Sequence, residues 1–254
     1  MARHNVYRFH AELADYEPKI WRRFEINGEK SVAELGYALM LMFEMRGSHL
    51  FLFTENVEDT LLADLRGAHT EAEIKDVWDE DFMSLLAKNH VYALSSHDME
   101  LGDDERLIKA DKIKLQGISK APGFSLTFEY DFGDGWKVDL ALEEFERRGV
   151  GLAYQPKVLD GAGYGIIENV GGARGLHELA KALKKGSGEE YDQFCEWLGG
   201  ATLDLEAFDI DDLNYRLQRL TRVYKNIYER HSPPADKTLS LLNRAYKGQG
   251  SRGY

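Results

Sequence analysis

The sequence predicts an α+β fold with a mixed or mostly antiparallel sheet. Runs of alternating apolar and polar residues indicate β-strands, because successive side chains of a strand point to opposite faces of a sheet. A capping motif near the start and an amphipathic pattern near the end indicate helices. We therefore expect a β-β-α-β start, a central β-hairpin and a helical C-terminal part.

The first 54 residues carry the β-β-α-β pattern. Two stretches, residues 6–13 and 20–26, alternate as half-buried strands do, and residues 50–54 are predicted as a further strand. In the second stretch, Arg22 falls on the apolar side, against the pattern of its neighbours. Between the second and third stretches, Ser31 and Glu34 have the spacing of a capping box, which predicts a helix from there to about Met45.

The central hairpin has the most regular pattern in the chain. From Phe124 to Phe132, and again from Trp136 to Glu143, apolar residues alternate with polar ones. Glycines on both sides of Asp134 supply the positive φ angles of a tight turn between these runs. Residues 55–120 are far less regular, and only a patchy pattern predicts a helix over residues 71–88.

A glycine-rich segment, residues 161–175, leads into the C-terminal helices. They are predicted at residues 176–184, at 189–198 and from the candidate N-cap Asp209 to about Ile227. The apolar residues of the last helix recur every three or four positions and require a partner surface on the sheet or on neighbouring helices. We expect one domain over residues 1–230, with a core at 5–175 and a helical part at 176–230. A basic, partly flexible extension over 231–254 follows.

The composition excludes several classes of protein. Thirty-two Lys and Arg residues against 44 Asp and Glu residues give a net charge of −12, which disfavours a broad surface for duplex nucleic acid. Nucleic acid is expected to associate, if at all, through the basic extension. The single cysteine, Cys195, rules out an intrachain disulfide and suits a reducing cytoplasm. No signal core and no apolar run of membrane-spanning length is present, so we predict a cytoplasmic protein without a membrane partner.

No standard catalytic signature is complete, and a set of carboxylates remains. Asp131 and Asp134 belong to the hairpin, and Glu168 lies in the glycine-rich segment, whose backbone freedom would let it approach. Oxygen ligands from two segments suit Mg²⁺, Mn²⁺ or Ca²⁺. The alternative is that these acids face water or bond their own backbone.

A second candidate surface is aromatic and basic. Trp21, Arg22, Arg23 and Trp136 would form a stacking or anion-binding patch, because Arg stacks on aromatic rings and forks onto carboxylate or phosphate groups. The alternative is that Trp136 packs in the core and the arginines pair with the many acids. His49, at the start of a strand, is a further candidate, as a ligand or as a structural histidine.

Several pieces, in order along the chain, resemble the plasmid pRiA4b ORF-3-like proteins, which also occur as passenger proteins of bacterial insertion sequences. The pieces are residues 7–13 with Pro18–Arg23, His49-Leu50 with Phe53, Tyr130-Asp-Phe-Gly-Asp-Gly-Trp136, Glu168-Asn-Val-Gly-Gly172 and residues 209–217. The resemblance covers about residues 5–220 and implies an α+β domain, with no settled activity. The chain departs from the usual pattern at Val138, at Ile166-Ile167 and at Asn169.

We predict a non-catalytic binding or accessory module, which the resemblance links to mobile elements, with a protein or a small ligand as partner. The alternative is a divalent-metal-dependent hydrolase or nuclease-like enzyme, in which an arginine clamps an anionic substrate. No cofactor other than that metal is expected, and whether a reaction is catalysed stays open. The candidate residues for the ligand surface are Trp21, Arg22, Arg23, His49, Tyr130, Asp131, Asp134, Trp136 and Glu168, of which Asp131, Asp134 and Glu168 are the candidate metal ligands.

Overall fold

The computed structural model describes residues 3–57, 60, 65–66, 69–70, 73–74, 89–94, 105–118, 122–200, 203–236, 238 and 242. In this part of the chain, eight strands form one sheet in the order β5-β4-β3-β6-β7-β1-β2-β8. Every neighbouring pair is antiparallel except β4 and β5, which are parallel. The predicted α+β class with a mixed, mostly antiparallel sheet is confirmed.

The described strands are β1 (His4–Leu13), β2 (Trp21–Asn27), β3 (Phe51–Glu55), β4 (Asn89–Ala93), β5 (Glu105–Lys109), β6 (Ser125–Tyr130), β7 (Trp136–Arg148) and β8 (Lys157–Ala162). The helices that lie wholly within the described residues are α1 (Val32–Met42), α5 (Leu115–Ile118), α6 (Gly172–Lys185), α7 (Glu189–Trp197) and α8 (Ile210–Arg230).

The β-β-α-β start forms as predicted, and α1 opens with the predicted capping box. The Glu34 backbone N–H donates to Ser31 Oγ over 3.2 Å, and the Ser31 N–H donates to the Glu34 carboxylate over 3.1 Å. Two orphan donors of the first turn are thereby satisfied. The helix ends at Met42 rather than at about Met45, because Glu44 adopts a positive φ of 60°.

The central hairpin is confirmed, with Tyr130 opposite Trp136 across the turn. Buried side chains alternate with partly buried ones along β6 and with exposed ones along the first half of β7, so one face of the sheet packs into the core and the other is more open. β6 pairs with β3 and β7 pairs with β1, so the hairpin is inserted between two strands of the N-terminal unit. It therefore lies in the middle of the sheet.

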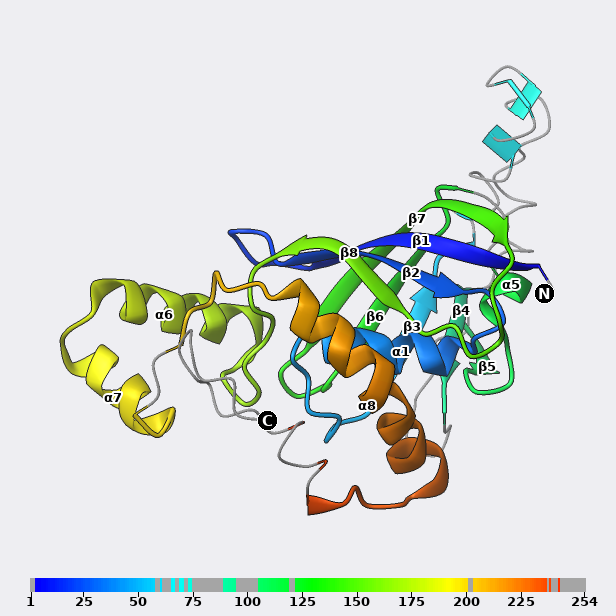
Figure 1. Cartoon of the computed structure of the whole chain (residues 1–254). Helices are drawn as coiled ribbons and strands as arrows, with labels where there is room; N and C mark the ends of the chain where they lie inside the picture. Colours follow the sequence, from blue (N-terminus) through cyan, green and yellow to red (C-terminus); the bar gives the residue numbers. More distant parts are fainter. Residues whose placement is uncertain are drawn as a thin grey trace.

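The helices form the second side of the core. Figure 1 shows α1 against the sheet and α8 running across α1 and β8, which are the partner surfaces that the apolar stripe of α8 required. Asp209 caps α8 as predicted, accepting the Asp212 N–H over 3.0 Å. α6 and α7 lie to the side, where His177 of α6 stacks on Tyr16 with ring centroids 4.5 Å apart.

Three strands were not predicted, and β8 shows why. Gly161 was assigned to the glycine-rich segment, whereas it lies in a strand opposite Arg22, and a Cβ at this position would approach the Trp21 carbonyl to 2.6 Å. The glycine thus serves close backbone approach inside the sheet. β4 and β5 fall in the irregular stretch 55–120. The helix predicted over 71–88 lies outside the described residues except at 73–74, and so does most of the extension 231–254.

Among the helices in the described ranges, none combines the length and the apolar character that a bilayer crossing needs.

Candidate functional site

Three loops meet at one end of the sheet. They are residues 43–50 between α1 and β3, the turn 131–135 between β6 and β7, and residues 163–171 between β8 and α6. Because Phe51 of β3 pairs with Tyr130 of β6, the loop before β3 and the turn after β6 lie side by side. The Asp131 N–H donates to the Leu50 carbonyl over 3.1 Å and ties them together. Most of the predicted site residues lie where these loops meet.

Glu168 is the centre of the site. It is 5% exposed, and one carboxylate oxygen accepts the Arg46 N–H over 2.6 Å and the Tyr130 hydroxyl over 2.8 Å. The other oxygen accepts the Ser48 hydroxyl over 3.0 Å. A buried carboxylate needs such donors, because transferring it from water to the protein interior without them costs several kcal/mol of folding free energy. The donors supply this compensation from one loop, residues 43–50, and from one strand, β6.

Tyr130 connects Glu168 to the first loop. Its hydroxyl accepts the N–H groups of Gly47 and Ser48 over 3.1 and 3.2 Å while donating to Glu168. Burial and the neighbouring Glu168 charge raise the pKa of Tyr130 well above its usual value, so the phenol stays a donor. Gly47 has a φ of 74°, and a Cβ there would collide with the ring of Tyr224. The loop therefore requires glycine at this position.

His49 lies between two carboxylates. Its Nε2 is 3.4 Å from Asp131 Oδ2 and 3.5 Å from Glu168 Oε2, and its side chain is about one-third exposed. The ring stands edge-on to Tyr130, with centroids 5.7 Å apart. The structure thus brings together four of the nine predicted residues, His49, Tyr130, Asp131 and Glu168.

Asp134 takes a different position from Asp131. Asp131 has a φ of 54°, and its Oδ1 accepts the Gly133 N–H over 3.1 Å, which closes the turn. The Asp134 carboxylate instead accepts the Gly171 N–H over 3.3 Å, and its carbonyl lies so close to Gly172 that a Cβ there would collide with it. Asp134 therefore docks the hairpin turn onto the glycine-rich segment.

The metal prediction gains no closed ligand set from these contacts. Asp131 and Glu168 both lie beside His49, whereas the Asp134 carboxylate accepts a backbone N–H, that of Gly171. Over the described ranges, no group of three or more His, Cys, Asp or Glu side chains is arranged to hold a metal ion. Metal binding by these three carboxylates stays a prediction for measurement in solution.

The aromatic-basic set does not form one surface. Trp136 is buried in the core, as the alternative interpretation has it. Trp21 and Arg23 share the open face of the sheet, where the Arg23 guanidinium forks onto Glu143 over 2.8–2.9 Å. The idea that Arg22 joins a surface patch or pairs with an acid is wrong. It is 1% exposed, and among the described residues its hydrogen-bond acceptors are backbone carbonyls, those of Trp21, Met42, Ala162, Gly163 and Tyr164.

A hollow of about 390 Å³ opens beside Glu168, and we call it the loop hollow. One wall is polar and comes from the loops, and the other is mainly apolar and comes from α8 and the chain after it. Its lining residues are Arg46, Gly47, Ser48, Glu168, Asn169, Ile227, Pro234 and Leu242. The sequence pattern did not single out Arg46 and Ser48, because they act through a backbone N–H and a common hydroxyl. In the sequence, these two residues are marked merely by lying within three positions of His49.

Comparison with known proteins supports the motif-based resemblance. A family model described as "Plasmid pRiA4b ORF-3-like protein" matches residues 5–213. "Uncharacterized protein y4hQ" from Sinorhizobium fredii (strain NBRC 101917 / NGR234) is 30% identical over 133 residues, 50% of this chain and 67% of that protein. The crystal structure of a protein of unknown function, MM3350 from Methanosarcina mazei Go1, has a TM-score of 0.60 and 23% identity. That match covers 83% of this chain and 97% of the other, and it establishes a shared fold.

Proposed function

This chain belongs to the plasmid pRiA4b ORF-3-like protein family, as its motifs predicted, and from that premise we propose that it is a non-catalytic binding module whose ligand occupies the loop hollow. The observation that carries the proposal is the engagement of Glu168 in the structure of the loops. Its carboxylate is buried and accepts hydrogen bonds from Arg46, Tyr130 and Ser48. Three of its roughly four acceptor positions are thus occupied by donors of the protein itself, which supports a role in fixing the shape of a wall.

The walls of the loop hollow indicate the chemistry of the ligand. Ile227, Pro234 and Leu242 offer an apolar surface, and Asn169 offers an amide on the opposite side. A volume of about 390 Å³ falls in the range of small-molecule sites, about 300–1,000 Å³. The proposed ligand therefore carries an amide beside a branched apolar group, as a free small molecule or as one side chain of a partner protein.

Saturation-transfer NMR with N-acetyl-leucine methylamide tests this proposal. We expect transfer from the wild-type protein, weaker transfer to the glycine analogue, and loss of transfer in Leu242→Lys, because the ammonium would enter the apolar wall. Leu152→Lys is the matched control, since Leu152 is exposed and does not line the hollow. Absence of transfer from the wild type, or equal transfer from both lysine variants, would overturn the proposal.

Native mass spectrometry of untagged protein tests the metal-dependent alternative. We expect the mass of the metal-free chain in a buffer containing Mn²⁺. A stoichiometric extra mass that disappears in Asp134→Ala would refute the non-catalytic proposal and support the hydrolase or nuclease-like reading. Asp139→Ala is a suitable control, because this acid lies on the open face of β7, where it accepts the Thr127 hydroxyl over 2.9 Å.

The proposal includes a cytoplasmic location and a link to mobile elements. The presence of one cysteine, Cys195, supports the first, because a chain with one thiol gains nothing from an oxidising compartment. The plasmid in the family description supports the second. Fractionation of cells expressing the untagged chain checks the location.

A further inference from the structure

A second hollow, of about 220 Å³, lies between the start of α1 and the C-terminal half of α8, and we call it the basic pocket. It shares no lining residue with the loop hollow. Its charged lining residues are Lys30, Glu34, Arg222, Lys225 and Arg230. Four cations therefore face one carboxylate, in a protein whose net charge is −12.

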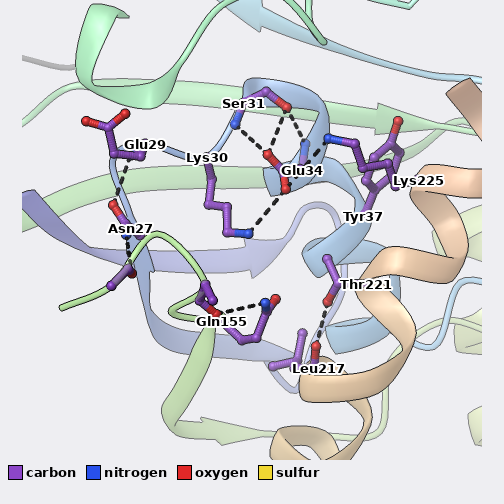
Figure 2. A network of polar contacts seen from close by, with 12 residues as sticks. Asn27, Glu29, Lys30, Ser31, Glu34, Tyr37, Gln155, Leu217, Thr221 and Lys225 are labelled. Carbon is purple, nitrogen blue, oxygen red and sulfur yellow. Dashed lines mark hydrogen bonds and ion pairs between the residues drawn. The ribbon is translucent and has the colours of Figure 1, made fainter. Parts of the chain in front are cut away.

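The one acid in the lining is already engaged. One oxygen of Glu34 accepts the Ser31 N–H in the capping box, and the other lies 3.2 Å from Lys30 Nζ and 3.9 Å from Lys225 Nζ (Figure 2). Burial alone would raise the pKa of Glu34, but the Ser31 N–H and the two ammonium groups hold it below its usual value. Glu34 thus stays ionised and holds the two lysines at the pocket.

Within the part of the chain that the structure describes, two positive charges of the pocket have no partner. There, no residue forms a hydrogen bond or an ion pair with the side chain of Arg222 or Arg230. Glu229, which is outside the lining, lies 3.8 Å from Lys225 Nζ and accepts the Tyr37 hydroxyl over 3.2 Å. Even if Glu34 and Glu229 neutralise both lysines, the guanidinium groups leave a charge of about +2 at the pocket.

We propose that the basic pocket binds the phosphate group of a small phosphate monoester. Such a group carries a charge of about −1.5 to −2 at neutral pH and three acceptor oxygens, which matches two guanidinium groups. Arg forks onto phosphate with paired N–H donors, and the neighbouring lysines add point charges. This inference is independent of the loop hollow and of the function proposed for it.

Size and overall charge favour a small molecule over a nucleic acid strand. The pocket is smaller than sites for drug-sized ligands, which start at about 300 Å³. A strand has to extend beyond it over a surface whose net charge is negative and repels further phosphates. A single phosphate group avoids this repulsion, because the local cations outweigh the distant acids at short range.

Calorimetric titration with glycerol 2-phosphate tests the assignment, with glycerol, succinate and a single-stranded DNA 12-mer as comparison ligands. We expect saturable binding of glycerol 2-phosphate, none of glycerol, and weaker binding of succinate and of the 12-mer. The variant R222Q/R230Q is expected to bind glycerol 2-phosphate at least about tenfold more weakly, because glutamine keeps a hydrogen-bond donor but removes the charge that strengthens the bond to phosphate.

The control R147Q/R219Q removes the same charge from exposed arginines outside the pocket, and we expect its affinity to stay within about twofold of wild type. Thermal unfolding checks that both variants fold. Four outcomes would overturn the proposal: no binding of glycerol 2-phosphate, equal losses in the two variants, tighter binding of succinate, or tighter binding of the 12-mer.

Discussion

Arg22 holds more backbone groups together than any other side chain described here. Its guanidinium donates to carbonyls at the end of α1, in β2 and after β8, over 2.6–3.0 Å. Burial lowers the pKa of Arg22 to about 10, so it remains charged at neutral pH. Phe43 and Phe208 pack against the guanidinium, with their ring centroids 5.3 and 4.9 Å from Cζ. One side chain thereby replaces several missing backbone partners.

Arg22→Lys is expected to lower the free energy of unfolding by roughly 2–4 kcal/mol, because one ammonium cannot reach five carbonyls and each buried unpaired group costs about 1–3 kcal/mol. Urea denaturation measures the change. Arg23→Lys, one residue along, changes an exposed fork and should cost under about 1 kcal/mol. Equal losses at the two positions would show that the buried contacts carry no special weight.

Glu25 should make the stability depend on pH. Burial raises the pKa of Glu25, but hydrogen bonds from Arg148 over 2.5 Å and Arg8 over 3.1 Å outweigh it and hold the pKa below 4.5. Because the folded-state pKa is lower than the unfolded one, the carboxylate stabilises the fold above about pH 4.5, and this contribution is lost as the pH falls through the folded value.

Glu25→Gln is therefore expected to cost about 1–2 kcal/mol at pH 7 and less at pH 3, because the stabilisation by the wild-type carboxylate declines once the pH falls below the unfolded-state pKa of about 4.5. Urea denaturation at both pH values provides the comparison. Glu146→Gln is the matched control, because Glu146 is an exposed partner of Arg148 and should show little change. A pH-independent cost at Glu25 would contradict the ion-pair explanation.

At the level of elements, the hairpin turn and the glycine-rich segment fix one another. Gly172 has a φ of 68° and contacts the Asp134 carbonyl, and Gly171 donates its N–H to the Asp134 carboxylate. Two motifs about 35 residues apart in sequence thus form one structural unit, since neither alone would hold this conformation. Glu168 lies just before this unit, which positions its carboxylate under Tyr130 and Ser48.

Gly172→Ala is expected to destabilise the protein by roughly 2–4 kcal/mol, because alanine is strained in the left-handed conformation and its Cβ would collide with the Asp134 carbonyl oxygen. Thermal and urea unfolding quantify the loss. Gly149→Ala serves as the control, because nothing lies within 4 Å of the added Cβ, and its change should stay within about 0.5 kcal/mol. If Gly172→Ala left the free energy of unfolding unchanged, the hairpin turn could shift relative to the glycine-rich segment without cost.

The elements that could be predicted from sequence are those whose pattern is local. Alternation identified β1, β2, β6 and β7, and caps identified α1 and α8. β8 was missed because its glycine and polar residues fit close approach at the sheet edge rather than alternation. The order of strands could not be predicted, since pairing of β1 with β7 joins residues more than 120 positions apart.

The candidate site was partly predictable for the same reason. The hairpin motif and the Glu168 segment pointed to Asp131, Tyr130 and Glu168, which the structure joins around His49. The burial of Arg22 had a signal in the sequence, its place on the apolar side of a strand pattern. The basic pocket had little signal in the sequence, because Lys30 and Arg222 are brought together by the packing of α8 on α1.

For the molecule as a whole, the net charge determines the strength and the salt dependence of any binding to nucleic acid. A charge of −12 repels the phosphate backbone, and the extension 231–254 holds four Lys or Arg residues against one Asp. Any binding of single-stranded DNA should therefore be weak, fall steeply with salt and disappear when the four cations Lys237, Arg244, Lys247 and Arg252 are replaced by Gln. Electrophoretic mobility shifts at two salt concentrations measure this, and binding that survives salt or the replacements would contradict it.

The insertion of the β6–β7 hairpin between β3 and β1 sets an order on how the chain acquires its structure. The first 55 residues can form β1, β2, α1 and β3, yet β1 and β3 never pair with each other in the sheet. β1 pairs with β7 and β3 pairs with β6, so both need a hairpin that is complete only at Arg148. At synthesis rates of about 5–20 residues per second, β1 and β3 lack their partners β7 and β6 for roughly 5–20 seconds, during which the strand edges that take the hairpin are open to chaperones and to other nascent chains.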